Sequence, residues 1–137
     1  MTQALLDTSV VHRIANLHVG DAIEERMVDG HLALCAPVVF EVCFGARNRS
    51  DLDQIRADLD AFPRVRTHQA TFDRALEVQA ELASSGRHRA ASMTDLLVAA
   101  AAEANGLAVL HYDADFDLIA EVTGQPVEWV VPRGLVD

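Results

Sequence analysis

Lysine is absent from this chain of 137 residues, because all eleven of its basic residues are arginine. The absence excludes several kinds of site. A Walker A loop, a Schiff-base enzyme and the phosphotransfer sites of receiver-like and haloacid-dehalogenase-like proteins all need a lysine amine. The 21 acidic residues give a formal net charge of −10, which repels a phosphate backbone on average. Any nucleic-acid binding would therefore need local clusters of arginine.

Cysteine and long apolar runs are also scarce. Cys35 and Cys43 form neither a CxxC pair nor a zinc-binding spacing, which indicates a reducing compartment and a place in the core. The six histidines show no HxxxH or HExxH pattern, so we expect no zinc site. No apolar run is long enough to span a bilayer, and the N-terminus does not resemble a signal peptide. We therefore expect a cytoplasmic protein without a membrane segment.

Half of the residues are apolar, enough for one core, and short apolar runs alternate with helix-length segments. The expected strands are 4–6, 32–35, 65–68, 107–112 and 127–131. The expected helices are 8–18, 21–29, 37–47, 51–61, 70–84, 93–104 and 115–122, with "SDLD" and "SMTD" as capping-box-like starts. This alternation predicts a single three-layer α/β/α domain over residues 1–137, with a mostly parallel sheet of about five strands.

Four acidic residues occupy notable places on this map. Asp7 and Asp113 directly follow expected strands, and Asp95 lies in the first turn of an expected helix. Each of the three is also compatible with an ordinary helix cap. Glu41 has three apolar residues on either side, and a carboxylate buried there without a partner would be strongly disfavoured. Because parallel α/β sheets form their sites at the carboxyl ends of the strands, we expect the acids to converge there.

Converging carboxylates repel one another, and a divalent cation offsets that repulsion. Ligands that are all oxygen favour Mg²⁺, with Mn²⁺ as a substitute. The segment "DADFD" opens like a calcium loop, but it has Leu118 where such a loop needs glycine and Gly124 where it needs glutamate. We therefore expect Mg²⁺ rather than Ca²⁺, bound where it can lower the pKa of a water molecule and orient it toward a phosphodiester.

The segments "LLDTSV", "MTDLLVAAAA" and "VLHYDADFDLIA", with Glu41 between the first two, occur in the order found in PIN-domain nucleases. The chain resembles the VapC-type toxins of type II toxin–antitoxin pairs over essentially its whole length. The resemblance implies a PIN-like fold and an endoribonuclease that depends on Mg²⁺ or Mn²⁺, is held by a cognate antitoxin and is usually a homodimer. It implies that the metal-binding and catalytic acids are Asp7, Glu41, Asp95 and Asp113.

Several further residues are candidates for substrate contacts. Thr8 or Ser9 resembles the hydroxyl residue that often follows the first acid of the family. His111 stands where the family commonly has Thr or Ser, so it either contacts RNA or a metal-bound water or is an ordinary strand-end histidine. Asp115 is close enough to share the role of Asp113. The arginines expected at the rim are Arg47, Arg49, Arg87 and Arg89, although solvated loop charges are the ordinary alternative.

The charge of the chain and its apolar helices also indicate binding partners. An antitoxin with a basic segment would offer an arginine to the acids, and the apolar helix 37–47 indicates a homodimer. Two other classes stay open at this point. One is an acidic α/β protein that binds a basic partner without catalysis, and the other is a metal-dependent phosphoesterase acting on DNA or small substrates. The sequence holds no code for which RNA is cut.

Overall fold

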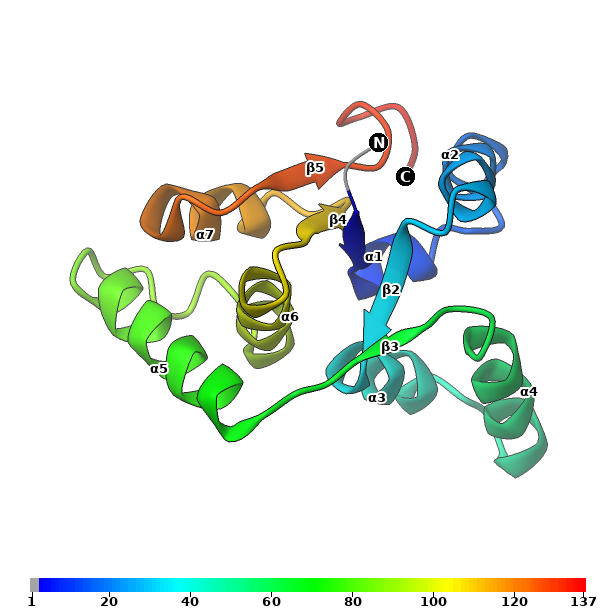
Figure 1. Cartoon of the computed structure of the whole chain (residues 1–137), viewed down its shortest axis with the longest axis horizontal. Coiled ribbons are helices and arrows are strands. Elements are labelled where there is room, and N and C mark those ends of the chain that lie inside the picture. Colours follow the sequence, from blue (N-terminus) through cyan, green and yellow to red (C-terminus); the bar gives the residue numbers. More distant parts are fainter. Residues whose placement is uncertain (1–2) are drawn as a thin grey trace.

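A computed structural model describes residues 3–137 and contains a five-stranded, all-parallel sheet in the order β3-β2-β1-β4-β5 (Figure 1). The strands are β1 (Ala4–Leu6), β2 (Leu32–Cys35), β3 (Arg64–Val65), β4 (Ala108–His111) and β5 (Val127–Trp129). Leu5 of β1 pairs with Ala33 of β2 on one side and with Val109 of β4 on the other. The predicted parallel sheet is confirmed, although β3 is shorter than expected.

Seven helices of the described chain connect the strands and flank the sheet (Figure 1). They are α1 (Thr8–Val11), α2 (Leu17–Val28), α3 (Ala36–Phe44), α4 (Arg49–Leu59), α5 (Gln69–Ala83), α6 (Met93–Ala104) and α7 (Asp115–Thr123). Helix α6 packs against α3, α5 and α7 as well as against β1 and β4. The three-layer α/β/α class expected from the sequence is therefore confirmed.

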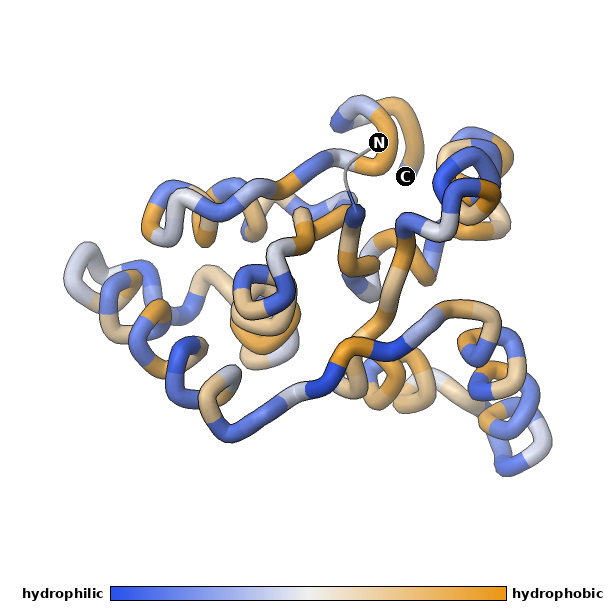
Figure 2. Tube along the Cα trace, in the orientation of Figure 1, coloured by the Kyte–Doolittle hydropathy of each residue, from blue (hydrophilic) through white to orange (hydrophobic). Residues whose placement is uncertain are grey.

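The core lies around the two central strands and α6. Every residue of β1 and β4 is buried, and so is the alanine run 99–102 of α6. Alanine favours the helix and allows its backbone to approach the sheet closely, which explains the apolar but small residues of this segment. Figure 2 shows hydrophobic colour on the central strands and much more hydrophilic colour on the outer helices α4 and α5.

One expected helix is wrong. The segment 8–18 is interrupted after α1, and α2 begins at Leu17, ahead of the expected start of the helix 21–29. The reason is Asn16, whose side chain accepts hydrogen bonds from the backbone N–H groups of His18 and Val19 at 2.9 and 3.4 Å. Such a cap starts a new helix and ends the turn before it.

The two expected capping boxes have different outcomes. "SMTD" is confirmed, since Ser92 caps α6 with reciprocal bonds to Asp95. The "SDLD" start is wrong, because Asn48 caps α4 by accepting from the backbone N–H of Asp51. Serine and asparagine are both favoured N-cap residues, so residue type does not distinguish Ser50 from Asn48. The path of the folded chain places Asn48 at the start of α4. No helix among residues 3–137 has the length and apolar character that crossing a membrane requires.

The strand order positions the site. The chain moves outward from β1 to β2 and β3, and then returns to the other side of β1 to form β4 and β5. The carboxyl ends of β1 and β4 therefore lie side by side at the point where the strand order reverses. In parallel α/β sheets this is where loops separate and ligands bind.

Candidate functional site

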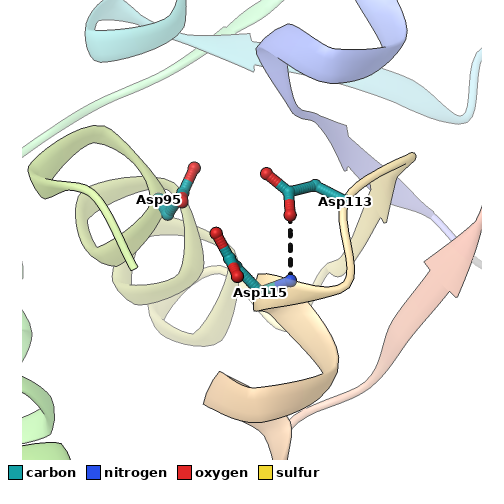
Figure 3. Close-up of side chains that lie close together, drawn as sticks. All are labelled: Asp95, Asp113 and Asp115. Carbon is teal, nitrogen blue, oxygen red and sulfur yellow. Dashed lines mark hydrogen bonds between the residues drawn. The ribbon is translucent and has the colours of Figure 1, made fainter. Parts of the chain in front are cut away.

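Three carboxylates converge beside the carboxyl end of β4. Asp95 comes from the first turn of α6, Asp113 follows β4, and Asp115 is the first residue of α7. Each offers an oxygen, and the three oxygens lie within 4.8 Å of one another. Figure 3 shows the side chains approaching one another from α6 and from the connection between β4 and α7. Asp113 Oδ1 also accepts a hydrogen bond from the backbone N–H of Asp115 at 2.9 Å, which fixes that connection.

Asp95 is both a helix cap and a member of the cluster. Its Oδ2 accepts from the backbone N–H of Ser92, and the Ser92 hydroxyl accepts from the backbone N–H of Asp95, both at 3.1 Å. The residue is buried, with 7% of its surface exposed. The capping box therefore fixes the side chain and directs the carboxylate toward Asp113 and Asp115. From the sequence, helix capping and metal binding are alternative roles for Asp95. In the structure its position is compatible with both.

Asp7 is buried more deeply, at the end of β1. Its Oδ2 accepts from the backbone N–H of Ser9 at 2.9 Å, which caps α1, and its own N–H donates to Leu110 of β4 at 3.0 Å. Its Oδ1 is buried and has no hydrogen-bond partner among the described residues. An unpartnered buried carboxylate oxygen is costly, and a cation would stabilise it. The donor set consists of carboxylate oxygens and fits a hard divalent cation.

The pKa shifts connect the acids electrostatically. Burial raises the pKa of Asp95 to about 7, with further contributions from the charges of Asp7 and Asp113. Burial also raises the pKa of Asp7, and the charge of Glu41 adds to it. The pKa of Asp115 is raised by burial and by Asp113. Each negative charge in this region disfavours ionisation of the neighbouring carboxyl groups. A bound cation would offset this repulsion.

Glu41 is placed differently from the expectation. It lies on α3 and is half-buried rather than enclosed, and the apolar neighbours Phe40 and Phe44 are themselves 78% and 92% exposed. The premise of a carboxylate buried within an apolar run is therefore wrong. Glu41 nevertheless acts on Asp7, whose pKa its charge raises, so it belongs to the outer part of the same acidic region.

The two hydroxyl residues after Asp7 differ in their contacts. Ser9 Oγ accepts from the backbone N–H of Tyr112 at 2.9 Å, which links the start of α1 to the segment after β4. Thr8 is buried, and its Oγ1 finds no hydrogen-bond partner in the described chain. Ser9 therefore holds the two strand ends together, while the Thr8 hydroxyl is available to a neighbouring group.

His111 is fully buried between Phe116 and Trp129, with ring centroids 5.2 and 4.9 Å away. Its Nδ1 accepts from the backbone N–H of Asp113 at 3.1 Å, and burial lowers its pKa. A neutral ring with its proton on Nε2 fits this bond. A direct contact with RNA does not fit this enclosed position. His111 Nε2 is 3.8 Å from Asp117 Oδ1 and has no hydrogen-bond partner among the described residues, so the neighbours satisfy the histidine only in part. Its contribution is to hold the loop that carries Asp113.

The four arginines expected at the rim have separate environments. Arg47, Arg49 and Arg87 pair with the carboxylates of Asp51, Asp53 and Glu121. Arg89 is exposed and has no such pair within residues 3–137. Sequence reasoning missed two other arginines, Arg13 and Arg133, which line a hollow next to Asp113. No spacing signal would have found them, because they come from opposite ends of the chain.

Comparison with known proteins agrees with this arrangement. Residues 4–122 match the PIN domain family. Ribonuclease VapC2 of Mycobacterium tuberculosis is 59% identical over 131 residues, covering 94% of this chain and 93% of the relative. Ribonuclease VapC51 of the same species is 44% identical over 133 residues, covering 97% and 96%.

A crystal structure of DNA-bound VapBC from Salmonella typhimurium has a TM-score of 0.77 and 19% identity, covering 96% of this chain and 100% of that one. VapBC2 from Rickettsia felis, bound to a promoter DNA fragment, has a TM-score of 0.75 and 18% identity, covering 92% and 98%. At these identities the structural likeness concerns the fold. Together with the sequence matches, it shows that the chain belongs to the PIN-domain family, in which it groups with the VapC proteins.

Proposed function

We propose that this protein is a divalent-metal-dependent endoribonuclease, the toxin of a type II toxin–antitoxin pair. The observation that carries the proposal is the cluster of Asp95, Asp113 and Asp115, whose oxygens lie within 4.8 Å of one another at the carboxyl edge of the sheet. The names of the related proteins support RNA as the substrate, since VapC2 and VapC51 are both called ribonucleases. The solved VapBC structures support an antitoxin partner.

The cation would be held by Asp7, Asp95 and Asp113, with Glu41 further out and Asp115 sharing the position of Asp113. Mg²⁺ is the expected ion and Mn²⁺ its substitute, because the ligands are carboxylate oxygens. When bound, the ion stabilises charge on the phosphate oxygens and lowers the pKa of a water molecule.

The chain itself supplies the positioning of these ligands. The backbone N–H groups of Ser9 and Ser92 each hold one oxygen of Asp7 and Asp95, which leaves the other oxygen of each carboxylate for the cation. Asp113 is fixed on two sides, by His111 at its N–H and by Asp115 at its Oδ1. Pre-oriented ligands of this kind need no rearrangement when the substrate arrives.

The proposed partner is an antitoxin that carries a basic segment. Both proteins are expected in the cytoplasm. A guanidinium pairs bidentately with carboxylates, and a chain of net charge −10 attracts a basic segment at long range. Inhibition should therefore weaken with added salt or Mg²⁺, and should be lost when the basic residues of the segment are replaced.

The chain is also proposed to form a homodimer. Phe40, Phe44, Phe72 and Met93 are all exposed and line one apolar hollow between α3, α5 and α6. An exposed apolar patch of this kind is typical of a protein interface.

The test is incubation of the purified protein with single-stranded RNA, single-stranded DNA and a chromogenic phosphoester, each with Mg²⁺, Mn²⁺ or EDTA. Cleavage of RNA alone, within the strand and only with a divalent ion, is the expected result. Cleavage of DNA or of the small phosphoester in preference to RNA would replace the proposal by a general phosphoesterase. No cleavage of any substrate, with tight binding of a basic peptide, would leave a non-catalytic binding protein.

A further inference from the structure

Beside the acidic cluster lies a second hollow of about 530 Å³, and Asp113 is part of its wall. Its other lining residues include Arg13, Tyr112, Trp129 and Arg133. We propose that this hollow binds the nucleotide next to the cut phosphodiester, with the phosphate of that nucleotide against Arg133. The inference rests on the proposed ribonuclease function and names the residues that hold the substrate beside the acids.

Four side chains of the hollow form a row in which two adjacent aromatic rings lie between two arginines. The Arg13 guanidinium carbon lies 4.9 Å from the centroid of the Tyr112 ring, and that of Arg133 lies 5.5 Å from the centroid of the Trp129 ring. The two rings meet edge to face at 5.4 Å. An aromatic face attracts a guanidinium but leaves its charge uncancelled, unlike a carboxylate. The row therefore fixes both guanidinium groups. Arg133 has no hydrogen-bond or ion-pair partner among the described residues, so its charge is available to an anion.

This environment distinguishes the two arginines from most others in the chain. Six arginines pair with side-chain carboxylates, namely Arg26, Arg47, Arg49, Arg64, Arg74 and Arg87. Arg13 instead donates from Nε and Nη1 to the main-chain oxygens of Asp137 and Ser9, both at 2.7 Å. Neither Arg13 nor Arg133 has a carboxylate side-chain partner within the described residues. Arg133 therefore supplies a local positive charge of the kind that a chain of net charge −10 needs beside its acids if it is to hold RNA.

The hollow is also built in a defined shape. The Tyr112 hydroxyl accepts from the backbone N–H groups of Gly134 and Val136 at 2.8 and 3.2 Å, and it donates to the Val136 carbonyl at 2.7 Å. These bonds hold the segment that carries Arg133. Trp129 Nε1 donates to Asp117 Oδ2 at 3.1 Å, which fixes the indole ring. The aromatic pair therefore forms a rigid support for the two guanidinium groups that cover its faces. In single-stranded RNA recognition, bases stack on guanidinium planes as well as on aromatic rings.

The experiment compares Arg133→Gln with Arg56→Gln. Both are exposed arginines without a carboxylate partner among residues 3–137, and Arg56 lies on α4, away from β5 (Figure 1). We measure kcat/KM for a short single-stranded RNA with Mg²⁺ at several NaCl concentrations. Arg133→Gln should lower kcat/KM roughly tenfold, mainly through KM, because a charged hydrogen bond to phosphate is lost. The slope of log(kcat/KM) against log[NaCl] should become shallower by about 0.7, the value for one phosphate contact with a single strand.

Trp129 provides a second readout because it is the single tryptophan of the chain. On rapid mixing with the RNA, its fluorescence should change before cleavage in the wild type and in Arg56→Gln, and much less in Arg133→Gln. Equal melting temperatures of the three proteins would show that the effect is not structural. If Arg133→Gln keeps the wild-type kcat/KM, salt slope and fluorescence change, the subsite is wrong while the ribonuclease function stands. If the wild type cleaves no RNA with Mg²⁺ or Mn²⁺, the proposed function fails, and the subsite fails with it.

Discussion

At the scale of single residues, Asp95 combines two functions in one carboxylate. Oδ2 caps α6 through Ser92, and the carboxylate also contributes an oxygen to the cluster with Asp113 and Asp115. Asp95→Asn keeps an acceptor for the cap but is a poor ligand for a hard cation. We expect RNA cleavage to fall by roughly three orders of magnitude, which corresponds to several kcal/mol of lost transition-state stabilisation.

Asp95→Ala is the matched control for the cap, and thermal melts with Mg²⁺ and with EDTA separate the two roles. It should lose the same activity and about 1 kcal/mol of stability in EDTA, and more in Mg²⁺ because a metal ligand is lost as well as the cap. Asp95→Asn should be no less stable than the wild type in EDTA. If the stabilisation of the wild type by Mg²⁺ persists undiminished in Asp95→Asn, Asp95 is not a ligand.

The raised pKa of Asp95 also predicts how the stability of the metal-free protein depends on pH. The carboxyl has a pKa of about 7 in the folded chain and 3.8 when unperturbed, so the folded state binds the proton more tightly. Stability should therefore be highest at low pH and fall as the pH rises from about 4 to about 7. At about 1.4 kcal/mol for each pKa unit, the decrease between pH 5 and pH 8 is on the order of 2 kcal/mol.

Urea unfolding in EDTA at several pH values measures this decrease. In Asp95→Asn the same range of pH should show a much flatter profile, because the titrating group is gone. If the stability of Asp95→Asn changes with pH in parallel with that of the wild type, another group causes the pH dependence. Asp7 is the first alternative, because burial raises its pKa as well.

At the scale of elements, the junction of α1 and α2 depends on Gly20. A Cβ atom at this position would lie 2.9 Å from the carbonyl oxygen of Ile14, in the turn that precedes α2. We expect Gly20→Ala to destabilise the protein by about 1 kcal/mol, because the overpacking cost of about 1–3 kcal/mol exceeds the gain in helix propensity. Gly45→Ala is the control, since its Cβ would meet only the Val42 carbonyl oxygen at an ordinary 3.5 Å. Denaturation midpoints compare the two variants, and a stabilised Gly20→Ala would show that the turn can shift.

At the scale of the whole molecule, the exposed apolar hollow around Phe44 predicts the oligomeric state. Phe44 is 92% exposed on α3, and Val28 is 86% exposed on α2. We expect the wild type to sediment as a dimer at micromolar concentration and Phe44→Ser to shift it toward the monomer, because the substitution removes apolar area from the interface. Val28→Ser removes a comparable exposed side chain elsewhere and should leave the dimer intact. A wild type that sediments as a single chain would contradict the proposed interface.

The class of the fold and the order of its elements follow from the amino-acid sequence. Alternation of apolar runs with helical segments requires parallel strands with helices between them, and the carboxyl ends of such strands meet at one edge. The places of Asp7, Asp95 and Asp113 follow from this rule and from the local capping pattern. Local signals were insufficient where two good caps compete, as at Asn48 and Ser50, because both fit the same stretch of chain.

Which side chains are exposed, and which charges find a partner of opposite charge, depends on the folded arrangement of the chain. Phe40 and Phe44 face solvent and Glu41 is only half-buried, whereas His111 is enclosed by rings from two other segments. Arg13 and Arg133 lie beside the same hollow although they are far apart along the chain. Burial, and the partner that each charge finds, depend on distances between segments remote in sequence. Local periodicity carries no information about these distances, and packing alone sets them.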